Sequence, residues 1–240
     1  MNEGVPERLA SIESRIAAAC LRAHRDPVEV TLLGAAKRQS DERLVAACRA
    51  GLRNFGENIV QEAEAHRRLL AGIDPTQRPT GDLTWHLIGP LQSNKVRKAI
   101  EIFDCVHSID RLKIARRLDL EARKASRKLT GFLEVNLGAE PTKHGFAPEE
   151  LPLIMAEVTS LDHLSITGLM AIPPVSKTDA DARGWFRRLR ELRDHFFQDS
   201  GSLSMGMSAD FEIAIEEGAT HVRVGSALFG PRSPRSSRPS

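Results

Sequence analysis

A strand-like segment followed by a helix-like segment, repeated along most of the chain, is the feature that most constrains the fold. In the first repeat, residues 28–36 are mostly β-branched or apolar, which is typical of a buried parallel strand, and the run ends at Lys37. Ser40 then offers a helix N-cap and Gly51 offers a C-terminal stop. This segment therefore predicts a strand, a short loop and a helix.

The same pattern recurs and gives about eight strands. We expect them at residues 28–36, 53–57, 84–89, 105–109, 131–136, 165–171, 202–205 and 221–225. We expect the helices at residues 41–50, 59–70, 94–100, 110–128, 148–159, 179–197 and 209–217. About eight such units in 240 residues favour an α/β fold closed as a (β/α)8 TIM barrel over an open doubly wound sheet. No G-x-G-x-x-G motif follows the first strand, which also argues against a dinucleotide-binding sheet.

The N-terminal segment predicts an extra helix before the first strand. Its apolar residues recur at helical spacing, at Leu9, Ile12, Ile16 and Ala19. This helix could cover the bottom or the edge of the barrel. Because no linker divides the chain, we expect residues 1–230 to form one domain.

The last ten residues, 231–240, contain only proline, serine and arginine, so we expect a disordered basic tail. The chain has 34 basic and 32 acidic residues and a formal charge of +2. The tail holds three arginines and no acid, so the rest of the chain carries −1. The positive charge therefore gives no support for a nucleic-acid partner.

Three further features limit the compartment and the kind of site that this chain can have. They are its three cysteines, its eight histidines and its N-terminal segment. The cysteines are far apart and form no C-x-x-C pair, which favours a reducing compartment over disulfides or a zinc site. No two histidines are spaced as H-x-H or H-x-x-x-H, so a metal-dependent hydrolase barrel is disfavoured. The first ten residues have no apolar core, and no apolar run approaches the length of a membrane span. We expect a cytoplasmic protein with no membrane partner.

Lys37 is the first candidate for chemistry, because reacting groups of such barrels come from the carboxyl ends of strands. At the end of an apolar strand its amine would be partly desolvated and could act as a nucleophile that forms a Schiff base. From position alone, the lysine could also end the strand with its ammonium in water.

The last two repeats supply candidate residues for an anion. Alternation along the last strand puts Arg223 on the opposite face from its two valine neighbours. If this face points inward, Arg223 lies inside the barrel, where a buried arginine needs an acceptor. Gly225 and Ser226 follow this strand, and Ser208 is placed to cap the helix at 209–217. Loops after strands seven and eight often bind phosphate in such barrels. Ser208 could also be an ordinary N-cap, and Gly225 an ordinary loop glycine.

Together these segments resemble, in order, the pyridoxal phosphate homeostasis proteins, which are single-domain relatives of the alanine racemase N-terminal barrel. The resemblance covers nearly the whole chain, from about residue 28 to residue 230. It rests on LGAAK (33–37), NFGEN (54–58), WHLIG (85–89), LQSNK (91–95), VHSID (106–110), GLMAIPP (168–174), LSMGMS (203–208) and VRVGSALFG (222–230).

The resemblance implies a cofactor, pyridoxal 5′-phosphate, and a role for each candidate residue. It implies that Lys37 holds the cofactor as a Schiff base and that Arg223 faces the pyridine nitrogen. It assigns the phosphate to Ser208, Gly225 and Ser226. It also implies that Asn58 lies beside the ring.

The resemblance further implies a protein that buffers or hands over pyridoxal phosphate in vitamin B6 homeostasis without robust catalysis. An arginine opposite the pyridine nitrogen weakens the cofactor as an electron sink, which suits a carrier better than a transaminase. We expect a monomer, with apo-forms of pyridoxal phosphate enzymes as candidate recipients. The alternatives are a racemase-like amino-acid enzyme, although the sequence has no tyrosine for a second proton-transfer group, and a Schiff-base aldolase acting on a phosphorylated sugar.

Overall fold

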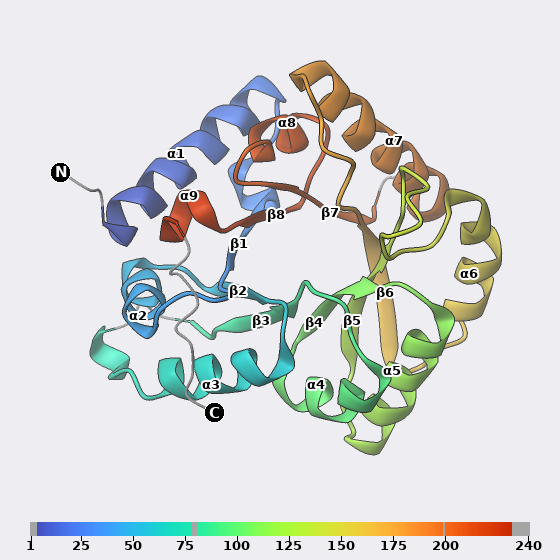
Figure 1. Ribbon diagram of the computed structural model, residues 1–240, viewed down its shortest axis with the longest axis horizontal. Helices are drawn as coiled ribbons and strands as arrows, with labels where there is room; N and C mark the ends of the chain where they lie inside the picture. Colours follow the sequence, from blue (N-terminus) through green and yellow to red (C-terminus); the bar gives the residue numbers. More distant parts are fainter. Residues whose placement is uncertain (1–3, 78–80, 199, 232–240) are drawn as a thin grey trace.

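A computed structural model of the chain describes residues 4–77, 81–198 and 200–231. Eight parallel strands pair in sequence order and close into a barrel, as predicted (Figure 1). The strands are β1 (Thr31–Ala35), β2 (Asn54–Glu57), β3 (Thr84–Leu87), β4 (Cys105–Ile109), β5 (Leu129–Glu134), β6 (Leu164–Met170), β7 (Ser202–Met207) and β8 (His221–Val224). The pairing of β1 with β8, in which Gly34 lies opposite Val224, closes the ring.

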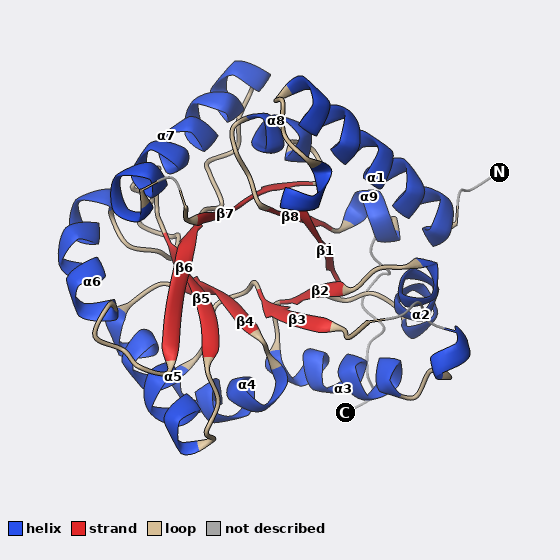
Figure 2. Ribbon diagram, turned by 180° about the vertical axis from the view of Figure 1, so that it is seen from behind, coloured by secondary structure: helices blue, strands red, loops and turns tan. Residues whose placement is uncertain are grey.

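Helices surround the ring of strands (Figure 2). They are α1 (Val5–Arg22), α2 (Asp41–Ala50), α3 (Val60–Ala71), α4 (Val96–Ile102), α5 (Leu112–Lys124), α6 (Leu151–Val158), α7 (Asp179–Phe197), α8 (Phe211–Glu216) and α9 (Ser226–Phe229). Short 3-10 turns lie at η1 (Pro27–Glu29), η2 (Pro75–Gln77), η3 (Ser93–Lys95) and η4 (Pro148–Glu150). None of the helices within the described ranges is both long enough and apolar enough to cross a membrane.

The predicted N-terminal helix occupies a place in the outer ring of helices. The helix that follows β8, α9, has only four residues and covers little of the barrel wall. Instead α1 packs against α2, α8 and α9 and covers this side of the barrel (Figure 1). The Arg15 side chain fixes α1 to α8, since it lies 4.5 Å from the Phe211 ring centroid and donates to Glu212 at 2.8 Å. The helix thus covers the edge of the barrel rather than its bottom.

The first strand is shorter than predicted. Residues 28 and 29 belong to η1, where Pro27 takes the first position and the Asp26 carboxylate accepts the Val28 N–H at 2.9 Å. β1 therefore begins only at Thr31. The predicted helices begin and end within about one turn of their expected bounds. Apart from Pro231, the predicted basic tail lies outside the described residues.

Apolar packing is concentrated between the strands and the helices. One large cluster fills this layer, and in it the rings of Phe55 on β2 and Trp85 on β3 stack at 5.3 Å. A second cluster contains only Cys105, Phe132 and Met170. Neighbouring inward positions on the strands carry buried histidine, serine and arginine side chains. The interior of this barrel is therefore largely polar among the described residues.

The packing of α1 predicts a stability effect of substitutions along it. Ile12 is 2% exposed. Ile12→Ala should lower the free energy of unfolding by about 2–4 kcal/mol, because it removes buried methyl groups and leaves a cavity. Urea denaturation followed by circular dichroism measures this change. The neighbouring Ser11 is exposed, so Ser11→Ala should change it by less than about 0.5 kcal/mol. Equal effects of the two substitutions would show that α1 is not part of the cooperative fold.

Candidate functional site

Lys37 lies in the turn that follows β1, at the carboxyl end of the strand, and its side chain is half-buried. The turn is tied to the neighbouring strand, since the Ala36 N–H donates to the Gly56 carbonyl at 2.8 Å. The Lys37 amine makes no hydrogen bond or ion pair with the residues that the structure describes. The amine is therefore available to a ligand at the mouth of the barrel.

Gly225 and Ser226 lie beside the turn that carries Lys37. Gly225 directly follows β8, and a Cβ atom placed on it would lie 3.5 Å from the Cβ atom of Ala35 at the end of β1. Ser226 begins α9, is exposed, and its hydroxyl makes no hydrogen bond to the described part of the chain. The barrel closure thus brings these three predicted residues to one side of the same rim.

Ser208 does not have the helix-capping role that its position predicted. It does not cap the helix after β7, because α8 begins at Phe211 and its N-cap residue is Asp210. Instead the Ser208 hydroxyl oxygen accepts the N–H groups of Gly225 at 3.1 Å and of Ala227 at 3.3 Å. The structure therefore groups Ser208 with the start of α9. Two backbone donors converge here on one oxygen, an arrangement that also suits an anion.

Arg223 points into the barrel, on the opposite face of β8 from its two valine neighbours, and is 5% exposed. One guanidinium nitrogen donates to the Ser204 hydroxyl at 2.6 Å and another donates to the Ala171 carbonyl at 2.9 Å. Both acceptors are neutral, and no carboxylate among the described residues forms a salt bridge with Arg223. Burial lowers the pKa of Arg223 to about 10, so the side chain stays charged at neutral pH.

Three histidines lie inside the barrel, and the sequence analysis did not assign them a role. They are His86 on β3, His107 on β4 and His221 on β8. Burial lowers the pKa of His86 to about 3 and that of His221 to about 4, and it holds the pKa of His107 well below its ordinary value. All three rings are therefore neutral at neutral pH. Alternate residues of a strand face the same side of the sheet, so the positions of these histidines on their strands are the sequence signal that would have grouped them inside the barrel.

Two of these histidines lie with Cys105 at distances that could suit a metal ion, with the ligand atoms within 4.8 Å of one another. The donor set does not fit one. His86 and His107 are hydrogen-bonded to each other at 2.9 Å, and their other ring nitrogens contact Asn54 and Ser204. Burial raises the pKa of the Cys105 thiol to about 12, so in this structure the third donor is a neutral thiol.

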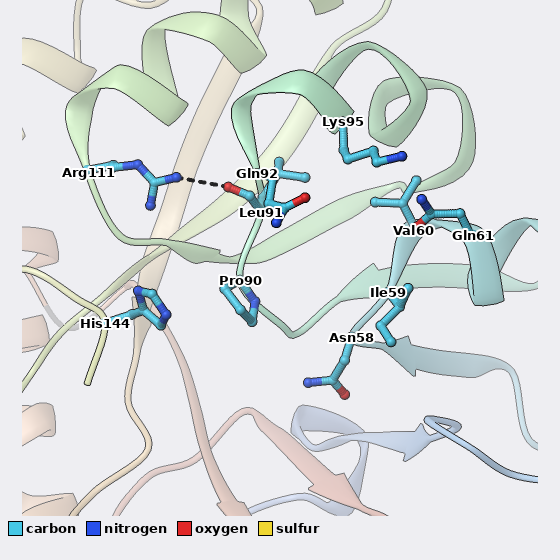
Figure 3. A pocket seen from close by; sticks show the side chains of 10 residues that line it. All are labelled: Asn58, Ile59, Val60, Gln61, Pro90, Leu91, Gln92, Lys95, Arg111 and His144. Carbon is cyan, nitrogen blue, oxygen red and sulfur yellow. Dashed lines mark hydrogen bonds between the residues drawn. The ribbon is translucent and has the colours of Figure 1, made fainter. Parts of the chain in front are cut away.

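Asn58 follows the end of β2, the strand that pairs with β1. It lines a cavity of about 400 Å³ formed by segments that follow β2, β3, β4 and β5. Figure 3 shows Arg111 and His144 on one side of this cavity and Asn58 on the other. A Cβ atom on Gly89 would lie 2.7 Å from Asn58, so a glycine is needed here for the close approach. Neither Lys37 nor Arg223 lines this cavity.

Glu134 is a further titratable group at this end of the barrel that the sequence analysis did not single out. It is the last residue of β5 and is 9% exposed. Burial, together with the nearby charge of Asp110, raises the pKa of the Glu134 carboxyl to about 7. Glu134 can therefore exchange a proton at neutral pH.

Comparisons with known proteins show the family and the fold. The pyridoxal phosphate homeostasis protein of Pseudomonas aeruginosa is 44% identical over 228 residues, which cover 95% of this chain and 96% of the relative. The structure of PipY from Synechococcus elongatus with PLP bound is 38% identical, superposes with a TM-score of 0.79, and is matched over 94% of this chain and 100% of its own.

The alanine racemase of Clostridium difficile shares the fold at only 15% identity. The two superpose with a TM-score of 0.67, over 93% of this chain and 57% of the racemase. Residues 18–233 match the family model described as the alanine racemase N-terminal domain. The chain therefore belongs to the pyridoxal phosphate homeostasis proteins, a family built on the alanine racemase N-terminal barrel.

Proposed function

We propose that this protein binds pyridoxal 5′-phosphate at the mouth of the barrel and takes part in intracellular vitamin B6 homeostasis. Residues 1–230 would act as one cofactor-binding domain. The cofactor would be held as a Schiff base on Lys37, and the protein would buffer it or hand it over without robust catalysis. The family membership and the cofactor bound to PipY support this proposal.

The observation that carries the proposal is the pairing of β1 with β8. This pairing places an uncommitted lysine amine next to a glycine turn and a helix start. A ligand that carries both an aldehyde and a phosphate fits this pair of features, because an amine captures the aldehyde and backbone N–H groups bind the phosphate. We assign the phosphate to Ser208, Gly225 and Ser226.

The remaining residues fit the ring of the same ligand. Arg223 keeps its charge inside the barrel without a carboxylate partner among the described residues, so it can face a neutral ring nitrogen. A cation at this place disfavours protonation of the ring nitrogen. Asn58 would lie beside the ring, at the edge of the neighbouring cavity. When bound, the cofactor supplies an aldehyde carbon that exchanges reversibly between amines.

A carrier role follows from what these residues hold in place. Arg223 weakens the electron-withdrawing power of the ring, which makes bond breaking at an amino-acid carbon harder and leaves exchange at the aldehyde carbon open. We propose that the protein works in the cytoplasm as a monomer and that apo-forms of pyridoxal phosphate enzymes receive the cofactor. A racemase-like enzyme is the alternative, and Glu134, a carboxyl that titrates near neutral pH, is the observation in its favour.

The attachment to Lys37 can be tested by reduction. The purified protein incubated with pyridoxal phosphate should be yellow, and borohydride should fix one pyridoxyl group on Lys37, which peptide mass spectrometry locates. Lys37→Ala should abolish the modification. Lys128 is exposed and carries no ion pair to the described residues, so Lys128→Ala should leave it unchanged. A colourless protein that stays unmodified would refute the proposed function.

The phosphate site predicts a loss of affinity with little loss of stability. Ser226→Ala removes a hydroxyl that would donate to a charged phosphate, so the dissociation constant for pyridoxal phosphate should rise about 10- to 100-fold. Gly225→Val should have a larger effect, because its side chain fills the space beside Ala35. Fluorescence titration measures the affinity. Ser165 is exposed at the start of β6, and Ser165→Ala is the control. Wild-type affinity in both site variants would place the phosphate elsewhere.

Turnover separates a carrier from an enzyme. The loaded protein is incubated with single L-amino acids, and chiral chromatography measures D-amino acid and keto acid. We expect at most one product molecule per protein molecule, because Arg223 weakens the electron-withdrawing power of the ring and so makes bond breaking at the amino-acid carbon harder. Sustained formation of D-amino acid that is lost in Glu134→Gln would instead establish the racemase-like alternative.

A further inference from the structure

A continuous row of hydrogen bonds crosses the interior of the barrel from Arg223 to Asn54. Arg223 donates to the Ser204 hydroxyl at 2.6 Å, and this hydroxyl lies 2.8 Å from Nδ1 of His107. Nε2 of His107 lies 2.9 Å from Nδ1 of His86, and Nε2 of His86 lies 3.2 Å from the side-chain oxygen of Asn54. These five residues, here called the interior network, come from β8, β7, β4, β3 and β2.

The interior network is cut off from water over most of its length. Ser204 and His107 are fully buried, and His86 and Arg223 are 4% and 5% exposed. The Phe132 ring covers part of the network, since it stacks on the His107 ring with the ring centroids 4.3 Å apart. Each buried polar group must therefore find its partner among protein groups rather than in water, because a buried donor or acceptor left unpaired is costly.

With the Asn54 oxygen facing His86, only one arrangement of protons satisfies every contact. Neutral histidine has one N–H and one bare nitrogen. If the Ser204 hydroxyl donates to Nδ1 of His107, then Nε2 of His107 carries the proton and donates to Nδ1 of His86. Nε2 of His86 then donates to the Asn54 oxygen. All bonds run in one direction, away from Arg223.

Hydrogen bonds that run in the opposite direction, toward Arg223, leave an unsatisfied contact at Ser204 and another at Asn54. If Nδ1 of His107 donated to Ser204, the serine oxygen would accept from two donors and its own proton would lose its acceptor in the network. Nε2 of His86 would then be bare and would face the Asn54 oxygen, so that two acceptors would lie 3.2 Å apart. A charged histidine would relieve this conflict, but burial keeps both rings neutral.

We propose that Ser204, His107 and His86 are positioning residues that orient Arg223 toward the ring of the bound cofactor through a one-way hydrogen-bond network anchored at Asn54. This inference rests on the proposed function for the identity of the ligand. Ser204 is the branch point, because its oxygen accepts from Arg223 while its proton fixes His107. The Ala171 carbonyl holds a second guanidinium nitrogen at 2.9 Å, so the guanidinium has little freedom to rotate.

The network itself can be tested without the cofactor. The full-length chain, labelled with ¹⁵N in its histidines, is measured by long-range ¹H–¹⁵N NMR before and after addition of pyridoxal phosphate. We expect neutral rings at pH 7 for His86 and His107, each with the proton on Nε2, in both states. A proton on Nδ1 of either ring, or a charged ring, would overturn the proposal whether or not the cofactor binds.

Coupling along the network is tested with a matched pair of serines on β7. Ser204→Ala should shift the ring signals of His86, although the two residues lie on different strands, and should raise the dissociation constant for pyridoxal phosphate about tenfold. Ser202 lies two residues earlier on β7, and its hydroxyl makes no hydrogen bond to the described residues, so Ser202→Ala should change neither. Borohydride labelling of Lys37 in Ser204→Ala should persist at saturating cofactor, because the attachment site is intact. Unchanged His86 signals and unchanged affinity in Ser204→Ala would overturn the positioning role.

Discussion

The parallel pairing of the first and last strands is the interaction on which the rest of the structure depends. It aligns Gly34 with Val224 and so closes the barrel. The same register sets the ends of the two strands side by side, which brings the turn of Lys37 next to Gly225 and Ser226. An open sheet would leave these residues at opposite edges. The candidate site thus exists only because the ring is closed.

The interior of this barrel is unusually polar among the described residues. Bulky branched side chains usually fill a parallel barrel, whereas here a small apolar cluster shares the space with the interior network. Such a network is stable because every member has a partner, and it holds its members in defined orientations. One guanidinium group can therefore stay buried on neutral acceptors alone. The hydrogen bonds that organise the interior therefore also hold the Arg223 guanidinium in its orientation.

The sequence predicted the architecture better than the contacts within it. Strand and helix periodicity is a local property, so the sequence predicted the eight strands and the opposite faces of Arg223 and its valine neighbours directly. Partners far apart in the sequence could not. Ser208 was expected to cap the next helix, yet its partners lie at the start of α9, a helix that the periodicity did not reveal. The register between β7 and β8 shifts between Ser204 and Met207, and alternation alone does not foresee such a shift.

The three histidines inside the barrel, His86, His107 and His221, also make the stability of the fold depend on pH. Burial holds their pKa values below the ordinary value of 6.5, whereas the unfolded chain exposes the same rings to water. Above that pH both states are neutral at these rings and their contribution to stability is complete. Below it the unfolded chain binds more protons, so the free energy of unfolding falls as the solution becomes more acidic. Neutral imidazole rings organise the interior of this barrel, so acid destabilises the fold through the same rings.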